Sequence, residues 1–435
     1  MGWKGKQKNN RYSYIFMNYV LYLFLIAFPI PLIILIFKYK TYTYVFSAFI
    51  SFIGIYMFII VGSIEVINDK DLFSFKYYFS LFIILFLFYI FYIFIFLLGK
   101  RLYINLSENI TLVKDRFSLT FIVCLWSISI LTFIVYFNRH GLPVIFDIDI
   151  KDYVDIYALR EEKWSFLSEG SHWYKAGFFT IPQIAVIYSY IYKIINKKYR
   201  FFFYTNLIIG IFFLILSATK SPIVELIFCL FITRLLLKEM SIKLLFFYFV
   251  LFLMVIFALL SLYYLDKSPS EVFTSLFDYL VMRILVDYTM THAYVLNIFP
   301  DLHDYFYGLT FGNPGNIFPF TSISLSHFIN VWVYGVVANC SVPSFSEGYA
   351  NFGFLGFLII LLIMFFQIII FQIIFKYLPV NVFVISLYIF FSVNMLNYAI
   401  SSIENVFPLE LILIFSILFF VYYIIQQFKK PHLLK

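Results

Sequence analysis

Residues 77–98 read YYFSLFIILFLFYIFYIFIFLL, an apolar run that contains no charged residue. A helix of this length matches the hydrocarbon thickness of a bilayer and satisfies its own backbone hydrogen bonds in lipid. The whole chain of 435 residues has the same character, because 63% of its residues are hydrophobic and only 12% are charged. The sequence therefore excludes a soluble fold and predicts an all-α polytopic integral membrane protein.

Similar apolar runs recur along the chain, and we expect about eleven transmembrane helices in a single transmembrane domain, residues 1–435. The runs are separated by short basic connections and by two long polar loops. The expected spans lie near residues 14–37, 41–62, 77–98, 117–137, 176–194, 201–217, 222–237, 244–265, 348–375, 379–399 and 403–425.

The orientation follows from the short connections, since Lys and Arg collect on the cytoplasmic side of a membrane protein. Lys197, Lys198 and Arg200 form one such basic connection. The two long loops, residues 138–175 and 266–346, are then external. Eleven spans also place the basic N-terminus outside, which requires either a re-entrant hairpin around Pro29 and Pro31 or an orientation set by the later loops.

Several classes of function have no support in the sequence. The net charge of +8 follows the distribution of Lys and Arg in short loops, so it does not indicate nucleic-acid binding. Three scattered cysteines form neither a disulfide framework nor a metal site. The histidines lack ligand spacing and no phosphate-binding loop is present, so we expect no metal and no cofactor.

Cations mark the first external loop and a short external turn. Arg160 falls on a short amphipathic helix predicted over 153–164, where it would lie over the bilayer surface, although it could equally pair with acidic neighbours such as Glu161. Lys220 precedes Ser221 and Pro222, which suit a helix N-terminus that favours an anion. The alternative for Lys220 is a snorkelling side chain paired with Glu225, an acid one turn inside the membrane.

The second external loop carries an amphipathic segment with Arg283, then a turn-rich segment with Asp304 and Tyr307. It ends in SFSEGYANFGFLG, residues 344–356, where Glu347 stands at the entrance to the ninth span. Gly353 and Gly356 would permit close helix packing there. Glu347 could alternatively serve only to stabilise a helix N-terminus.

In this order between the spans, these segments resemble the O-antigen (oligosaccharide repeat-unit) polymerase family. The resemblance covers roughly residues 137–360, and two positions depart from the family pattern. Lys220 stands where the family usually has arginine, which keeps the charge but loses the bidentate fork. Gly170 follows Arg160 one position earlier than the corresponding glycine of some members. The matching stretches are the turn 141–143 with Arg160 downstream, the turn 216–222, the Arg283 region followed by Tyr307 and Gly308, and 347–356.

The resemblance implies an architecture like that of membrane glycosyltransferases (GT-C-like) in the bacterial cytoplasmic membrane. The implied reaction joins polyprenyl diphosphate-linked oligosaccharide repeat units at the external face, with polyprenyl diphosphate as the leaving group. A chain-length regulator and a flippase of polysaccharide biosynthesis are the implied protein partners. The implied catalytic residues are Arg160, Lys220 and Arg283 on the diphosphate and Glu347 as base, with His327 and Asp304 as weaker candidates for the base, and the implied substrate-binding residues are Arg139, Tyr307, His327 and Asn351.

Two other functions share the same lipid-linked material. A ligase would use the same donor and a different acceptor, which the loop sequences do not distinguish. A flippase or exporter would be expected to show repeat symmetry and charges deep inside several spans, whereas most acidic residues here lie in the loops. A non-catalytic scaffold would tolerate loss of the loop arginines.

Overall fold

The computed structural model describes part of the chain, and the described residues are entirely without strands. The chain divides into two compact units. Four helical segments of the described part are long and apolar enough to cross a membrane: 119–139, 176–195, 197–216 and 354–377. The described residues are 54–55, 62–63, 66, 74–99, 119–141, 176–216, 221–237, 250, 254, 286–311, 319–335, 340–378, 381–401 and 416–425.

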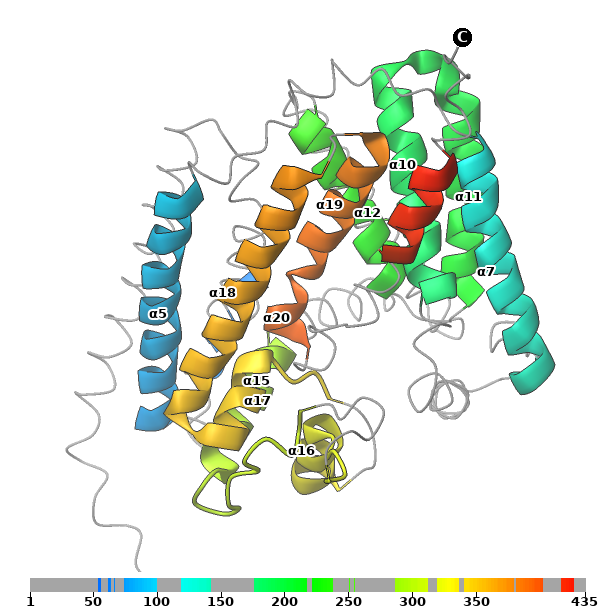
Figure 1. Cartoon of the computed structure of the whole chain (residues 1–435). Helices are drawn as coiled ribbons and strands as arrows, with labels where there is room; N and C mark the ends of the chain where they lie inside the picture. Colours follow the sequence, from blue (N-terminus) through cyan, green and yellow to red (C-terminus); the bar gives the residue numbers. More distant parts are fainter. Residues whose placement is uncertain are drawn as a thin grey trace, which may run out of the picture. The chain divides into compact units, whose positions relative to one another are not determined.

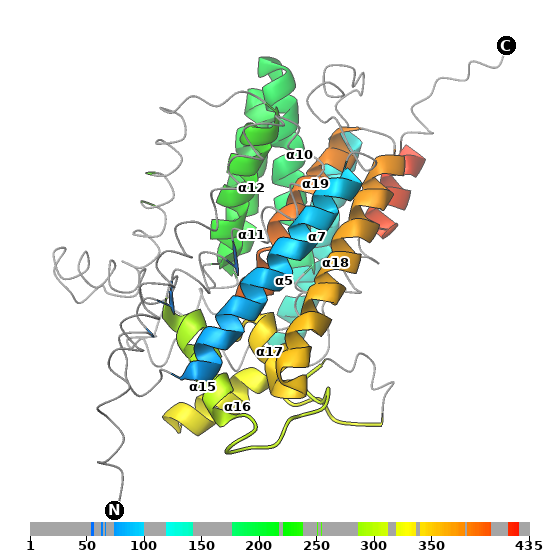
Figure 2. The same ribbon diagram turned by 90° about the vertical axis from the view of Figure 1, so that its left-hand side faces the viewer.

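Unit 1 is built on two long helices, α5 (Phe75–Gly99) and α18 (Phe354–Tyr377, which belongs to unit 1 as far as Ile373). Aromatic rings join them along their length, since Phe79 lies 5.1 Å from Phe354 and Phe91 lies 4.7 Å from Phe365 between ring centroids. Figure 2 shows the two helices side by side, with three short helices gathered at one end of them. These are α15 (Asp287–Ile298), α16 (Leu325–Tyr334) and α17 (Ser344–Phe352).

Unit 2 is a bundle around α10 (Ile181–Ile195), which is preceded by a π-helical turn, η3 (Ala176–Thr180) (Figure 1). Most of α10 is buried because helices pack on several sides of it. A short basic 3-10 turn, η4 (Lys197–Tyr199), joins α10 to the next helix, where the sequence predicts a basic connection. Its cytoplasmic location stays a prediction. The surrounding helices are α7 (Leu119–His140), α11 (Arg200–Leu216), α12 (Ser221–Leu237), α19 (Val382–Asn394) and the helix Ser416–Ile425.

The outward faces of several long helices are apolar, as a lipid environment requires. On α5, for example, Phe82, Phe86 and Ile90 repeat every four residues and are each about half exposed. Such a continuous exposed apolar stripe would be unfavourable in water. The apolar helices identify a protein embedded in a membrane.

Two of the expected spans are wrong in their boundaries. The span near 348–375 is interrupted at Gly353, where φ is +61° and a Cβ would lie 2.8 Å from the Tyr305 hydroxyl oxygen. Residues 344–352 thus form the separate helix α17, and α18 begins at Phe354. The span near 379–399 ends at Asn394, and a single helical turn, α20 (Asn397–Ile400), follows.

The remaining expectations divide between confirmed helices and undescribed segments. Helices occur close to the spans expected at 77–98, 117–137, 176–194, 201–217 and 222–237, and part of 403–425 is helical. The chain turns at Gly141 (φ +75°), as predicted, one residue after α7 ends. Spans near 14–37, 41–62 and 244–265 lie essentially outside the described residues, and the expectation of a single transmembrane domain stays a prediction.

Candidate functional site

A buried acid lies at the start of α17, in unit 1. Glu347 is in the first turn of this helix and only 1% exposed. Its Oε1 accepts a hydrogen bond from the Thr310 hydroxyl at 3.0 Å. The free N–H groups of a helix N-terminus favour negative charge at this position. Glu347 therefore occupies an environment built for a carboxylate, and its carboxylate is shielded from solvent in this arrangement.

Asn351 joins α17 to the turn that carries Thr310. Its Nδ2 donates to the Thr310 Oγ1 at 2.6 Å and to the Glu347 carbonyl oxygen at 2.8 Å, while its Oδ1 accepts from the Gly308 N–H at 2.7 Å. Asn351 is fully buried. These contacts give Asn351 a positioning role in the fold, and its predicted role in binding substrate stays a prediction.

The turn itself presents one of the predicted substrate-binding residues. Tyr307 has φ +52° and Gly308 has φ +97°, so two successive residues adopt left-handed backbone angles. Backbone hydrogen bonds from Phe306 to Ala350 and from Tyr307 to Asn351 hold the turn on α17. As a result Tyr307 is 74% exposed although its backbone is bonded to a member of the buried cluster of Glu347, Thr310 and Asn351.

A second buried cluster begins one residue before Glu347. His292 on α15 lies between two serine hydroxyls, with its Nε2 3.0 Å from the Ser80 Oγ and its Nδ1 2.9 Å from the Ser346 Oγ. Burial lowers the pKa of His292 to about 3, so the imidazole is neutral at physiological pH. One ring nitrogen then donates and the other accepts, which links α5, α15 and α17 through a single side chain.

His292 is a residue that was not selected from the sequence. The available signal was its position on α15, where Thr289 and Thr291 make one region of the helix polar although it is buried. Buried polar side chains are almost always hydrogen-bonded, so the buried His292 imidazole is expected to have partners. The partners Ser80 and Ser346 are far away along the chain, so no local pattern identifies them.

Other predicted residues lie away from these clusters. His327 is exposed on the first turn of α16, where its backbone N–H bonds to the Ser324 hydroxyl oxygen. Asp304 is exposed, and its carbonyl oxygen lies 2.6 Å from the Nδ1 of His303. Arg139 is exposed at the C-terminal end of α7 in unit 2, where a cation complements the helix dipole.

The three predicted diphosphate ligands, Arg160, Lys220 and Arg283, lie outside the described residues, so their roles stay predictions. Within the part of the chain that is described, no group of three or more His, Cys, Asp or Glu side chains is arranged to hold a metal ion. The two clusters of unit 1 contribute a carboxyl group, an imidazole and hydroxyl groups.

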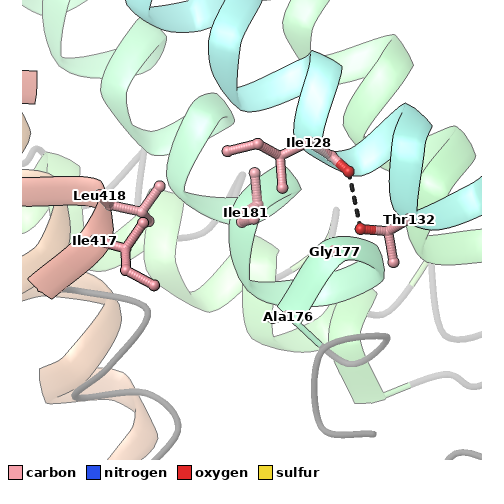
Figure 3. Close-up of a pocket in the computed structure, with 7 residues that line it drawn as sticks. All are labelled: Ile128, Thr132, Ala176, Gly177, Ile181, Ile417 and Leu418. Atoms are coloured by element: carbon pink, nitrogen blue, oxygen red, sulfur yellow. Dashed lines mark hydrogen bonds between the residues drawn. The ribbon is translucent and has the colours of Figure 1, made fainter. Parts of the chain in front are cut away.

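Unit 2 contains a small apolar pocket of about 90 Å³, lined from three segments of the chain (Figure 3). Close packing defines one wall, because a Cβ at Gly177 would lie 2.4 Å from the Thr132 Oγ1. That hydroxyl donates to the Ile128 carbonyl oxygen at 2.8 Å, so the wall presents almost no polar surface. The lining residues are Ile128, Thr132, Ala176, Gly177, Ile181, Ile417 and Leu418.

Comparison with known proteins adds no assignment. No protein-family model matches the chain, and neither a curated protein nor a solved structure is significantly similar to it. The residues themselves are therefore the basis for assigning a function.

Proposed function

We propose that this protein is a membrane glycosyltransferase that polymerises polyprenyl diphosphate-linked oligosaccharide units at the external face of the bacterial cytoplasmic membrane. The proposal rests on one observation. A buried carboxylate, Glu347, is held by Thr310 and Asn351 in a polar cluster next to membrane helices, within the segment 344–356 that carries the sequence resemblance. Burying an acid this fully is energetically costly, and a role in catalytic proton transfer accounts for its presence.

The reaction requires one bond to break and one to form. The bond between the anomeric carbon of the growing glycan and its diphosphate breaks, and the electron pair leaves with polyprenyl diphosphate. A hydroxyl of the incoming unit forms the new bond and gives its proton to Glu347. In this scheme the acceptor hydroxyl takes the place of the Thr310 hydroxyl at Glu347 Oε1, and the exposed Tyr307 stacks against the sugar.

The leaving diphosphate is assigned to the cations selected from the sequence, Arg160, Lys220 and Arg283. A diphosphate is already a good leaving group, so neutralising its charge as it departs is the main requirement. Loss of one such electrostatic donor typically lowers a rate by about 10²–10³. The donor and acceptor both carry polyprenyl chains, which belong in lipid and explain a protein embedded in the membrane.

The test measures release of polyprenyl diphosphate by purified protein in detergent. Glu347→Gln should reduce the rate by about 10²–10⁴, the usual contribution of a general base. Asp304→Asn tests the weaker candidate for the base, an exposed acid of the same loop, and this variant should keep most of the activity if Glu347 is the base. Equal rates for the two variants at equal abundance would remove Glu347 from the reaction.

A second set of variants tests the cations by charge and by shape. Arg160→Ala and Arg283→Ala should each lower the rate by about 10²–10³, and the Lys variants should recover part of the loss because they keep the charge. Normal rates for all four variants would rule out a diphosphate-binding role for these arginines and favour a scaffold.

A further inference from the structure

A second polar centre lies in unit 2, among helices that are otherwise apolar. Gln183 of α10 donates from its Nε2 to the Glu225 Oε2 at 3.3 Å and to the Pro222 carbonyl oxygen at 3.1 Å. The amide of Asn394, at the end of α19, lies beside the Glu225 carboxylate. α10, α12 and α19 are packed against one another, so two helices direct polar side chains to an acid on the third.

The predicted orientation places Gln183, Glu225 and Asn394 at a similar depth in the membrane. With the orientation predicted from the basic connections, α10 and α12 enter from the external side and α19 returns to it. Gln183, Glu225 and Asn394 each lie toward the external end of their own helix. An ionised carboxylate among buried neighbours such as Leu226 is costly unless a positive charge balances it.

The amide of Gln183 indicates that something binds beside Glu225. This side chain is 0% exposed, and its Oε1 has no hydrogen-bond partner in the described part of the protein. Buried acceptors are almost always satisfied, because an unsatisfied one retains the full cost of its desolvation. A ligand that meets this oxygen must bring either a positive charge or a hydrogen.

Charge balance selects among such ligands. Among the described residues, the centre holds one carboxylate and two neutral amides, so one positive charge neutralises it. A divalent ion would leave an excess positive charge, and a sugar hydroxyl would leave the carboxylate uncompensated. The nearest titratable side chain along α12 is Cys229. The charged residues of the packed helices lie toward the helix ends that are away from Glu225. These charged residues are Lys193 on α10, Arg200 on α11 and Arg234 on α12.

We infer that Glu225, Gln183 and Asn394 form an intramembrane site for a single monovalent cation, either a proton or a sodium ion, that exchanges with the external side. Carboxylates and side-chain or backbone oxygens bind both ions in this way within membranes. Such a site would make an activity of the protein sensitive to external pH or sodium. The inference does not depend on the proposed glycosyltransferase reaction.

Lys220 is the rival source of charge, because it precedes α12 and lies outside the described residues. A Lys220–Glu225 ion pair would keep Glu225 ionised without any bound cation. The two arrangements differ in whether the carboxyl group is ever protonated in the folded protein.

Labelling with dicyclohexylcarbodiimide distinguishes the cation site from the Lys220–Glu225 ion pair, because the reagent modifies protonated carboxyl groups in apolar surroundings. The purified chain in detergent is treated with the reagent, and modification of Glu225 is followed by mass spectrometry. We expect labelling to be several-fold greater in acidic than in alkaline buffer, because the reagent modifies only the protonated carboxyl group. At a fixed pH, replacing choline chloride by sodium chloride should lower labelling several-fold if the site takes sodium, and should leave it unchanged if the site takes only the proton.

Two variants test the geometry. Gln183→Leu removes the unpartnered oxygen and should shift the pH dependence of labelling or abolish protection by sodium. Thr233→Val is the matched control, because the Thr233 hydroxyl bonds only within α12, to the Cys229 carbonyl oxygen at 2.6 Å, and this variant should label like the wild type.

Two results would overturn the inference. One is absence of labelling at every pH in the folded protein, with normal labelling after unfolding in detergent to show that the reagent works. The other is labelling that appears only in Lys220→Gln, which would assign the balancing charge to Lys220.

Discussion

Thr310→Val removes one hydroxyl group from the candidate catalytic cluster while nearly conserving the shape of the side chain. The hydroxyl donates to Glu347 at 3.0 Å and accepts from Asn351 at 2.6 Å, and all three residues are buried. Its loss removes a hydrogen bond to the Glu347 carboxylate, worth about 1.5–3 kcal/mol, and leaves an Asn351 amide N–H without an acceptor, worth about 1–3 kcal/mol. We therefore expect destabilisation by about 3–5 kcal/mol.

The measurement is the thermal melting of the purified protein in detergent, where a loss of this size should lower Tm by roughly 5–10 °C. Thr291→Val is the matched control, since the Thr291 hydroxyl bonds to the Asp287 carbonyl oxygen of its own helix. Its removal should cost less than about 1 kcal/mol, because the backbone carbonyl can keep its helical partner. Equal melting temperatures for the two variants would refute the bridging role assigned to Thr310.

Further predictions concern the buried histidine and the helix crossing. The pKa of His292 is lowered in the folded protein to about 3. The stability that the neutral imidazole contributes is therefore complete above the ordinary histidine pKa of 6.5, and it is lost as the pH falls toward 3, at about 1.4 kcal/mol per pH unit. His292→Gln should flatten the dependence of Tm on pH between about pH 7 and about pH 5. Gly356→Ala should prevent folding, because its Cβ would lie 1.9 Å from the Gly348 carbonyl oxygen, as judged by yield of monodisperse protein. Gly335→Ala, where φ is +68° and nothing lies near the added atom, should cost only about 1–2 kcal/mol of backbone strain. Equal yields for the two variants would contradict the close approach of α17 and α18 at Gly348 and Gly356.

The long helices could be predicted because hydropathy is a local property of the chain. The run at 77–98 lies within α5, and the basic residues 197–200 mark the turn between α10 and α11. The interruption at Gly353 could not be predicted in this way, because apolar residues continue beyond it and the break depends on a positive φ and on the Tyr305 hydroxyl beside it. Of the two glycines expected to allow close packing, Gly356 does so against Gly348, and Gly353 instead ends a helix.

The candidate site likewise contains residues that the sequence identifies and others that only the fold reveals. Glu347 could be selected from the sequence because an acid beside a membrane span is rare and costly. Its partner Thr310 and the turn held by Asn351 are distant in sequence, so only the fold reveals them. His292 was missed for the same reason, since its two serine partners belong to α5 and α17.

The most direct test of the proposed function is reconstitution of the protein in liposomes with a synthetic polyprenyl diphosphate-linked repeat unit. Glycan length is followed by gel electrophoresis, without nucleotide or added metal. The proposal predicts a ladder of lengthening glycans, with release of polyprenyl diphosphate and loss of the ladder in Glu347→Gln. Intact substrate that only changes leaflet would contradict it and identify a transporter of the same lipid-linked material.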